Sequence, residues 1–279
     1  MTTRLRRSAL FLPASNARAI AKARTLDCDV VILDIEDAVA PDLKAAARDQ
    51  ALAAAREGGF GERMLVLRVN GLDTAWGADD CRAASGAGFD AVLLPKVSHP
   101  ADLHAARALV DATPLWAMIE TCAAMLDLPA IVASASANGL ECLVAGTNDL
   151  AKEMRCVAGP ARTPLLPHLI AILTAARAAG LTAFDGVCNV LEDGDVLAAE
   201  CAQGAMFGFD GKSLIHPAQI TAANRAFGRS AATVAWAERV VAAFALPENA
   251  DKGAIRVDGQ MVERLHLAEA ERVLEISRL

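Results

Sequence analysis

The chain has 279 residues, of which 54% are hydrophobic and only 4% aromatic, and its formal net charge is −7. The apolar content argues against a disordered chain, and a pI near 5.3 argues against nucleic acid as a general partner. No stretch reaches the roughly 20 uninterrupted apolar residues that a membrane span requires. We therefore expect neither nucleic acid nor a membrane as partner, and predict a small anion instead.

The seven cysteines are scattered, with no CxxC pair and an odd total. This distribution predicts neither a disulfide framework nor a zinc knot. A reducing compartment suits such a chain, so we expect a cytoplasmic protein.

Apolar runs of strand length recur along the chain and alternate with Ala- and Leu-rich stretches whose apolar residues have helical spacing. The predicted strands are 8–13, 30–35, 64–70, 91–96, 115–120, 142–146, 183–187 and 205–209. The predicted helices include 16–24, 42–56, 101–110, 122–135, 166–179 and 193–202. About eight such units close a TIM (β/α)₈ barrel. An open doubly wound sheet would alternate similarly, but no GxGxxG follows the first strand, so the barrel is preferred.

A C-terminal arm follows the eighth unit. A helix is expected at 231–244, then a segment rich in Pro, Gly, Asn and Asp that predicts a loop, then a last amphipathic helix. We expect no core-forming sheet in this arm. The predicted domains are a barrel at 1–229 and a C-terminal helical extension at 230–279, lying on the barrel or on a neighbouring subunit.

Carboxylates close several of the apolar runs. Asp34, Glu36 and Asp37 end VVILDIED, Glu120 ends LWAMIE, and Asp149 ends ECLVAGTND. The carboxyl ends of barrel strands share one face, where active sites are built, so we expect these acids to converge. All-oxygen ligands favour Mg²⁺, with Mn²⁺ as an alternative.

Each acid has a predicted part in this metal site. Glu120 and Asp149 are the expected ligands, and Glu36 and Asp37 are expected to hold the waters that Mg²⁺ retains. The alternative for Glu120 and Asp149 is a plain helix-capping role, because each lies at the start of a predicted helix.

Two cations end neighbouring strands. Arg68, at the end of MLVLRVN, suits bidentate capture of a carboxylate or a polarised carbonyl oxygen, and a structural ion pair with a strand-two acid is the alternative. Lys96, at the end of VLLPK, could form a Schiff base if its pKa were lowered, but the surrounding acids favour a charged lysine. His216, in GKSLIHPAQI, is expected to fix its loop rather than transfer protons.

The motifs LFLPASN, DIEDAV, LRVNG, LLPK, IET, GTNDL and GKSLIHPAQI occur in this order. Over nearly its whole length the chain thereby resembles the HpcH/HpaI aldolase and citrate lyase β-subunit family, in particular its stand-alone CitE-like, malyl-CoA or citramalyl-CoA lyase branch. The resemblance implies a TIM barrel, a homotrimer or hexamer, and Mg²⁺-dependent chemistry on a 3-hydroxyacyl-CoA. It also implies Glu120 and Asp149 as metal ligands, Arg68 as the substrate-oxygen contact, and Glu36 and Asp37 as the shell around the metal.

The C-terminal arm resembles the lid that in CoA lyases of this family reaches over a neighbouring subunit's site. The position matching Glu263 is ordinarily an aspartate acting on the acyl carbon, and the extra methylene here displaces the carboxylate. A surface role for Glu263 and a substitute role for Asp258 are the alternatives. Coenzyme A, as part of the substrate, would need basic residues at the rim, and candidates around the first strand are Arg7, Arg18 and Lys22, with Arg4 and Arg6; a solvated basic face is the alternative.

The leading functional hypothesis is a Mg²⁺-dependent carbon–carbon lyase that cleaves a short 3-hydroxyacyl-CoA into a 2-oxo acid and an acyl-CoA. Three alternatives remain: a malyl-CoA thioesterase or malate-synthase-like activity, in which condensation is followed by thioester hydrolysis; a citrate lyase β-subunit acting on a carrier-protein-bound citryl thioester; and a non-catalytic oxoacid-binding protein. The lid argues for free CoA over the carrier protein, and Glu263 is the feature that favours the silent binder.

Overall fold

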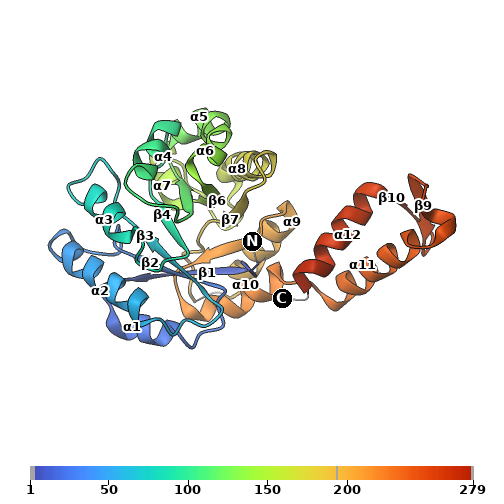
Figure 1. Cartoon of the computed structure of the whole chain (residues 1–279), viewed down its shortest axis with the longest axis horizontal. Helices are drawn as coiled ribbons and strands as arrows, with labels where there is room; N and C mark the ends of the chain where they lie inside the picture. The colour runs from blue at the N-terminus through green and yellow to red at the C-terminus, as the bar shows by residue number, and fades with distance from the viewer. Residues whose placement is uncertain (1–3, 193, 278–279) are drawn as a thin grey trace. The chain divides into compact units, whose positions relative to one another are not determined.

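The structure, a computed structural model, describes residues 4–192 and 194–277, and these contain a closed barrel of eight parallel strands in sequence order (Figure 1). The strands are β1 (Ser8–Pro13), β2 (Val30–Asp34), β3 (Met64–Arg68), β4 (Ala91–Leu94), β5 (Leu115–Ile119), β6 (Leu140–Ala145), β7 (Thr182–Asp185) and β8 (Gly211–Leu214). Each strand pairs with the next, and β8 closes on β1. The predicted TIM barrel is confirmed.

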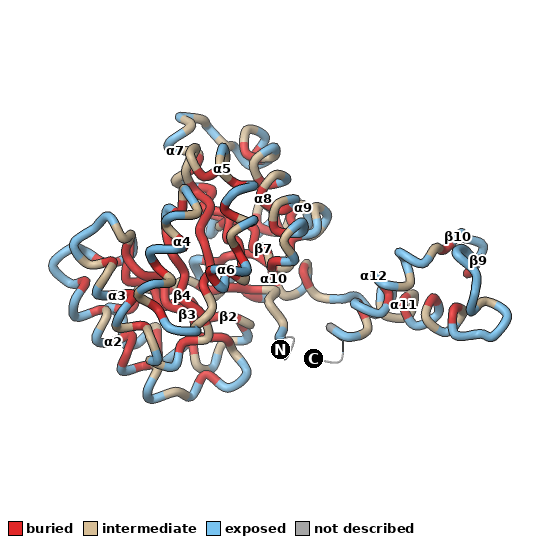
Figure 2. Tube along the Cα trace, turned by 45° about the horizontal axis from the view of Figure 1, so that its top comes forward, coloured by how far each residue is buried: buried red, intermediate tan, exposed pale blue. Residues whose placement is uncertain are grey.

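Both faces of the strands are buried, because one fills the barrel and the other meets the helices (Figure 2). Ile32 belongs to the interior cluster, whereas its neighbour Leu33 belongs to the cluster shared with the helices. Trp116 and Phe184 fill the interior with ring centroids 5.5 Å apart, and the Arg6 guanidinium lies 5.6 Å from the Trp116 ring centroid. This two-sided burial explains why the strands are continuous apolar runs rather than alternating ones.

Helices follow the strands around the barrel. They are α1 (Ala17–Ala23), α2 (Lys44–Glu57), α3 (Gly77–Ala84), α4 (Pro100–Arg107), α5 (Cys122–Ala133), α6 (Ala135–Asn138), α7 (Thr147–Met154), α8 (Leu166–Ala178), α9 (Gly194–Phe207) and α10 (Ile220–Phe227), with 3₁₀ turns η1 (Pro41–Leu43), η2 (Thr163–Leu165) and η3 (Pro217–Gln219). The helix predicted at 193–202 begins at Asp193, which lies outside the described residues. Over residues 4–192 and 194–277, no helix combines the length and apolar character of a membrane crossing.

The eighth strand lies a few residues later than predicted. The prediction of a strand at 205–209 is wrong, because its first residues end α9 and the strand is β8. β8 reads GKSL, and both Lys212 and Ser213 are buried. A fully buried lysine is tolerated there because its ammonium lies 3.0 Å from Asp185 Oδ2. No apolar run marks such a strand.

The chain divides into two compact units: Arg6–Phe227 form the barrel unit, and the part from Gly228 onward forms the second unit with the residues before Arg6. It contains α11 (Ala231–Phe244), the 3₁₀ turn η4 (Pro247–Asn249), β9 (Ala254–Val257), β10 (Gln260–Glu263) and α12 (Arg264–Ser277). The expectation of no sheet is wrong: β9 and β10 form an antiparallel hairpin. Asp258 and Gly259 at its turn have φ of +49° and +82°, the conformation of a two-residue turn with an Asp-Gly signature.

This C-terminal unit has an apolar core of its own. Val240 and Phe244 of α11, Val257 and Val262 of the hairpin, and Val273 of α12 are all buried in one cluster. Arg239 of α11 lies over the Trp236 ring, 5.6 Å from its centroid, and its Nε is 2.7 Å from Asp258 Oδ2 at the hairpin turn.

Candidate active site

Asp34 and Arg68 form a buried ion pair at the carboxyl ends of β2 and β3. They are register partners in the barrel, and they share strand parity with the interior residues Ile32 and Val66. Arg68 donates from Nε to Asp34 Oδ1 at 2.8 Å and from Nη2 to Oδ2 at 2.5 Å. Burial lowers the pKa of Arg68. The neighbouring carboxylates of Asp34 and Glu36 raise it by more than burial lowers it, so the pKa lies above the ordinary value of an arginine.

Glu36 is held between two cations just beyond β2. Its Oε2 lies 3.1 Å from Arg68 Nη1, and its Oε1 accepts from Lys96 Nζ at 2.6 Å. The Asp37 carboxylate is more exposed and lies 3.8 Å from Lys96 Nζ. The structure thus brings together four of the residues singled out from the sequence: Glu36, Asp37, Arg68 and Lys96.

Two residues that sequence reasoning missed, Lys44 and Asn70, hold the backbone of the loop that follows β2. Buried Lys44 donates from Nζ to the carbonyl oxygens of Ile35 and Glu36, at 3.2 and 2.9 Å, and lies 5.3 Å from the Trp76 ring centroid. Asn70 donates from Nδ2 to the Ile35 carbonyl at 2.9 Å. These hydrogen bonds fix the backbone at Ile35 and Glu36, and thereby the orientation of the Glu36 side chain.

Glu120 follows β5 and is almost completely buried, with 1% of its surface exposed. Its Oε1 accepts from the Lys96 backbone N–H at 2.8 Å, whereas its Oε2 is buried without a hydrogen-bond partner in the part of the chain that the structure describes. Gly146 leaves room for it: a Cβ there would collide with Glu120 Cβ and Oε2. Desolvation, with help from the charges of Asp149 and Glu36, raises the pKa of Glu120 to about 7.

Asp149 lies in the first turn of α7, which starts directly after Gly146. Its charge acts on Glu120, so the two carboxylates are electrostatic neighbours. A divalent cation fits this pair, because it would satisfy the unpartnered Glu120 Oε2 and offset the repulsion. Among residues 4–192 and 194–277 no group of three or more His, Cys, Asp or Glu is placed to hold a metal, so the candidate is a two-carboxylate site completed by water and substrate oxygens, as Mg²⁺ commonly accepts.

The basic residues predicted around the first strand occupy different places. Arg7 precedes β1, at the amino end of the barrel, and is bound there by Asp29 through Nε and Nη2, both at 2.8 Å. Arg18 and Lys22 are exposed on α1; Arg18 lies in its first turn, which follows the carboxyl end of β1. The structure therefore does not bring Arg7 to the carboxylates.

His216 caps η3, in agreement with the loop-fixing role expected for it. Its Nδ1 accepts from the Ala218 backbone N–H at 3.2 Å, and Gln219 Oε1 accepts from the His216 N–H at 3.2 Å. Gln219 also reaches the next loop, donating from Nε2 to the Cys188 carbonyl at 2.9 Å.

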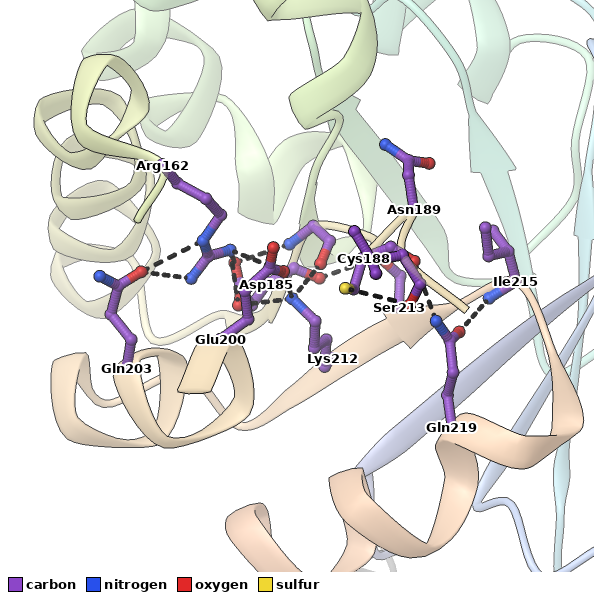
Figure 3. A network of polar contacts seen from close by, with 12 residues as sticks. Arg162, Asp185, Cys188, Asn189, Glu200, Gln203, Lys212, Ser213, Ile215 and Gln219 are labelled. Atoms are coloured by element: carbon purple, nitrogen blue, oxygen red, sulfur yellow. Dashed lines mark hydrogen bonds and ion pairs between the residues drawn. The ribbon is translucent and has the colours of Figure 1, made fainter. Parts of the chain in front are cut away.

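A second polar cluster, on the helix-facing side of β7 and β8, was not found from the sequence (Figure 3). Lys212 Nζ lies 3.0 Å from both Asp185 Oδ2 and Glu200 Oε2. Arg162 donates from Nη1 to Asp185 Oδ1 at 2.7 Å and from Nη2 to Gln203 Oε1 at 2.7 Å. All four charged groups are buried, and their charges balance because two cations face two carboxylates.

This cluster supports the loop after β7. Lys212 Nζ also donates to the Gly186 carbonyl at 2.6 Å. Further along the same loop, the side-chain amides of Asn189 and Asn148 donate to each other, at 2.7 and 3.3 Å. Asn148 directly precedes Asp149, so the buried cluster, the β7 loop and the start of α7 are mechanically connected.

In the C-terminal unit, the two acids considered for the lid differ in their surroundings. The Asp258 carboxylate is engaged by Arg239 at the hairpin turn. Glu263 ends β10, and its backbone N–H donates to His266 Nδ1 at 2.9 Å.

Comparison with known proteins decides the family. The model of the HpcH/HpaI aldolase/citrate lyase family matches residues 7–217, which is most of the chain. The chain belongs to the HpcH/HpaI aldolase/citrate lyase family. A (3S)-malyl-CoA thioesterase of Cereibacter sphaeroides (strain ATCC 17025 / ATH 2.4.3) is 46% identical over 96% of this chain and 93% of its own length. A citrate lyase subunit beta of Leuconostoc mesenteroides subsp. cremoris is 32% identical over 98% of this chain and 94% of its own.

A solved family member is also similar. The CitE protein of Mycobacterium tuberculosis, in complex with magnesium, acetoacetate and coenzyme A, superposes with a TM-score of 0.80 at 32% identity, covering 99% of this chain and all of its own. This HpcH/HpaI family relative binds a divalent metal, a small oxoacid and CoA together.

Proposed function

We propose that the protein is a Mg²⁺-dependent enzyme that binds a short 3-hydroxyacyl-CoA of the malyl-CoA type and hydrolyses its thioester. The observation that carries the proposal is the site around Glu120, whose Oε2 is buried and unpartnered in the described chain and whose carboxyl group is under the influence of the Asp149 charge. Mg²⁺ at Glu120 and Asp149 would supply a Lewis acid for oxygens of the substrate.

The protein's own groups have clear parts in this proposal. Arg68 and Lys96 place two positive charges beside Glu36. These charges would offset part of the negative charge of the neighbouring acids, so that an anionic substrate could still bind there. Glu36 and Asp37 would hold waters of the metal shell. Glu263 is the proposed lid acid, and Arg18 and Lys22 are the proposed rim contacts for CoA phosphates.

Hydrolysis is placed first because of sequence similarity. The thioesterase relative is 46% identical over nearly the full chain, against 32% for the citrate lyase subunit beta. In hydrolysis of malyl-CoA, water adds to the thioester carbon, the C–S bond breaks, and the products are malate and the free thiol of CoA.

Carbon–carbon cleavage is the second candidate, because the CitE relative has been solved with a metal, an oxoacid and CoA in one complex. In this reaction the hydroxyl proton is lost, the bond between the hydroxyl-bearing carbon and the carbon next to the thioester breaks, and the latter carbon keeps the electron pair and takes up a proton. Malyl-CoA then yields glyoxylate and acetyl-CoA, without release of free thiol. A carrier-protein substrate is the corresponding alternative for the citrate lyase branch.

One assay separates these reactions. Purified protein is incubated with malyl-CoA, citramalyl-CoA and citryl-CoA, with Mg²⁺ or with EDTA, and free thiol and 2-oxo acid are measured in parallel. EDTA-sensitive thiol without 2-oxo acid supports hydrolysis. EDTA-sensitive 2-oxo acid without thiol supports the lyase. No product with any of the three substrates would contradict activity on free CoA esters.

The assembly is proposed from the family resemblance. We expect a homotrimer or hexamer, which light scattering after size-exclusion chromatography would measure directly.

A further inference from the structure

Arg68 and Lys96 both lie at the barrel mouth, where the carboxyl ends of the strands meet, and they are not equally available to a ligand. Arg68 directs Nε and Nη2 to Asp34, and its Nη1 lies near Glu36 Oε2 and, at 3.5 Å, near Met118 Sδ. Its side chain is only 11% exposed, and Phe11 lies against the guanidinium, 4.9 Å away. The protein itself therefore saturates most of the donors of Arg68.

Lys96 is different. Its side chain is 45% exposed. An ammonium has three protons to donate, and in the described part of the chain it makes one hydrogen bond, to Glu36 Oε1. Donors of Lys96 thus remain for an anion that enters the mouth.

The backbone of Lys96 supports a functional role. Its φ of +53° lies in the left-handed region, which favours glycine and disfavours a lysine. The conformation aims the Lys96 N–H at Glu120 Oε1, but a glycine could make that contact equally well. Strained residues of this kind cluster at functional sites, and the ammonium is what a lysine adds here.

We propose that Lys96 is a substrate-binding residue whose ammonium contacts the carboxylate of a short hydroxy or oxo acid. This inference rests on the proposed function, because it assumes that an acid of this class binds at the mouth.

The charge state of Lys96 is consistent with anion binding. Partial burial lowers its pKa, but the hydrogen bond and charge of Glu36, with the charges of Asp37 and Glu120, raise it above the ordinary value of a lysine. A raised pKa keeps the ammonium charged at neutral pH and disfavours Schiff-base formation, which requires the free amine.

The test compares three variants that all retain the backbone N–H toward Glu120: Lys96→Gly, Lys96→Ala and Lys96→Arg. Calorimetry measures the affinity of each for Mg²⁺ alone and, at saturating Mg²⁺, for malate, citramalate, glyoxylate and oxaloacetate. Thermal unfolding without ligand measures stability. Lys96→Gly and Lys96→Ala lose the same ammonium, but only alanine keeps the disfavoured backbone conformation, so the pair separates charge from strain.

The expected result is that Lys96→Gly and Lys96→Ala lose affinity for the bound acid equally, by about 10- to 100-fold, the effect of a charge-assisted hydrogen bond. The midpoint of Lys96→Ala should lie about 2–4 °C below that of Lys96→Gly. Lys96→Arg should recover part of the affinity, and none of the three variants should lose affinity for Mg²⁺.

Three outcomes would overturn the inference: unchanged acid affinity in Lys96→Gly, affinity losses that follow the midpoints of the variants, or a loss confined to Mg²⁺. If the unmodified protein binds no acid of the panel, the inference and the proposed function both fail. If it binds one and Lys96→Gly weakens it, but no CoA ester is turned over, only the proposed function fails.

Discussion

The two oxygens of the buried Glu120 carboxylate differ in their hydrogen bonding. One oxygen is satisfied by the Lys96 N–H, and the other has no hydrogen-bond partner in residues 4–192 and 194–277. Leaving a buried polar atom unpaired is costly, so the arrangement is understandable when a ligand completes it.

The raised pKa of Glu120 predicts pH-dependent metal binding. With a pKa of about 7, the carboxyl is mostly protonated at pH 6 and mostly ionised at pH 8. Mg²⁺ binds the ionised form, so its affinity should fall about tenfold from pH 8 to pH 6. Calorimetric titrations at the two pH values measure this. Glu120→Gln should bind Mg²⁺ weakly at both; equal affinity of the unmodified protein at both pH values would contradict the prediction.

Glu120 should also make the metal-free protein more stable in mild acid. A raised pKa means that the folded state binds this proton more tightly than the unfolded state does. The associated stability is present at low pH and is lost as pH rises from the ordinary value of a glutamate through about 7. The midpoint of thermal unfolding in EDTA should therefore fall more between pH 5.5 and 7.5 for the unmodified protein than for Glu120→Gln, and a parallel fall in both would argue against it.

Glu120 packs against Gly146, which has no side chain and therefore leaves room for the Glu120 carboxylate. We predict that Gly146→Ala lowers Mg²⁺ affinity by about tenfold or more, because the new Cβ displaces the Glu120 carboxylate. Gly194→Ala serves as control, since a Cβ at that glycine meets no atom within 4 Å. Equal Mg²⁺ titrations for both variants would show that Glu120 can move without consequence.

Some of these residues could be found from the sequence and others could not. Glu36, Glu120 and Arg68 are polar residues that end apolar runs, and the barrel brings such ends together. Lys44 carries no comparable signal, because it follows no apolar run and its hydrogen bonds go to backbone carbonyls of the loop after β2. The ion pair between Arg68 and Asp34 depends on the register of β2 and β3, which a single sequence does not reveal.

At the scale of elements, β7, β8 and α9 are joined by the buried cluster of Arg162, Asp185, Glu200 and Lys212. A charge inside an α/β interface requires a partner, because desolvation of an isolated ion costs several kcal/mol or more. The cluster also holds the Gly186 carbonyl, so its geometry is transmitted to the loop at the barrel mouth.

Removal of one cation from this cluster should be strongly destabilising. We predict that Lys212→Met lowers the free energy of unfolding by about 3–5 kcal/mol, since Glu200 and Asp185 would then be buried with only Arg162 as counter-ion. Urea denaturation measures the change. The double variant Lys212→Met, Glu200→Gln should recover part of the loss. A Lys212→Met loss below about 1 kcal/mol would mean that water reaches the cluster.

Strand prediction from the sequence succeeded for some strands and failed for others, for reasons that the structure makes clear. β2, β3 and β5 are uninterrupted apolar runs, so pattern alone identifies them. β8 has a charged residue whose partners lie on other elements, and local sequence is silent about those partners. The β9–β10 hairpin was missed for a different reason: its Asp-Gly turn was interpreted as part of a loop, although such a dipeptide between alternating residues is typical of a hairpin.

At the scale of the whole molecule, the C-terminal unit raises the question of which acid a lid would contribute. Asp258 is already paired with Arg239, and this leaves Glu263 as the better candidate. We predict that Glu263→Gln lowers kcat by about 100-fold or more, the usual size of a general acid–base contribution. Steady-state kinetics with the CoA ester that the protein turns over measure the effect.

Asp258→Asn is the matched comparison, because it removes one carboxylate from the same hairpin. Its ion pair is half-exposed and such pairs contribute little, so kcat should stay within about threefold of the unmodified protein. The reverse pattern, with Asp258→Asn inactive and Glu263→Gln active, would transfer the role to Asp258.

The chain contains three tryptophans and no tyrosine, and each tryptophan described above lies beside a cation in a different region. Trp116 lies in the barrel interior with Arg6, Trp76 beside Lys44 at the loop that carries Glu36, and Trp236 beside Arg239 in the C-terminal unit. Indole emission therefore comes from three separable positions without a phenolic background. Variants that keep one tryptophan each would let fluorescence follow the barrel, the mouth loop and the C-terminal unit as independent signals during ligand binding or denaturation.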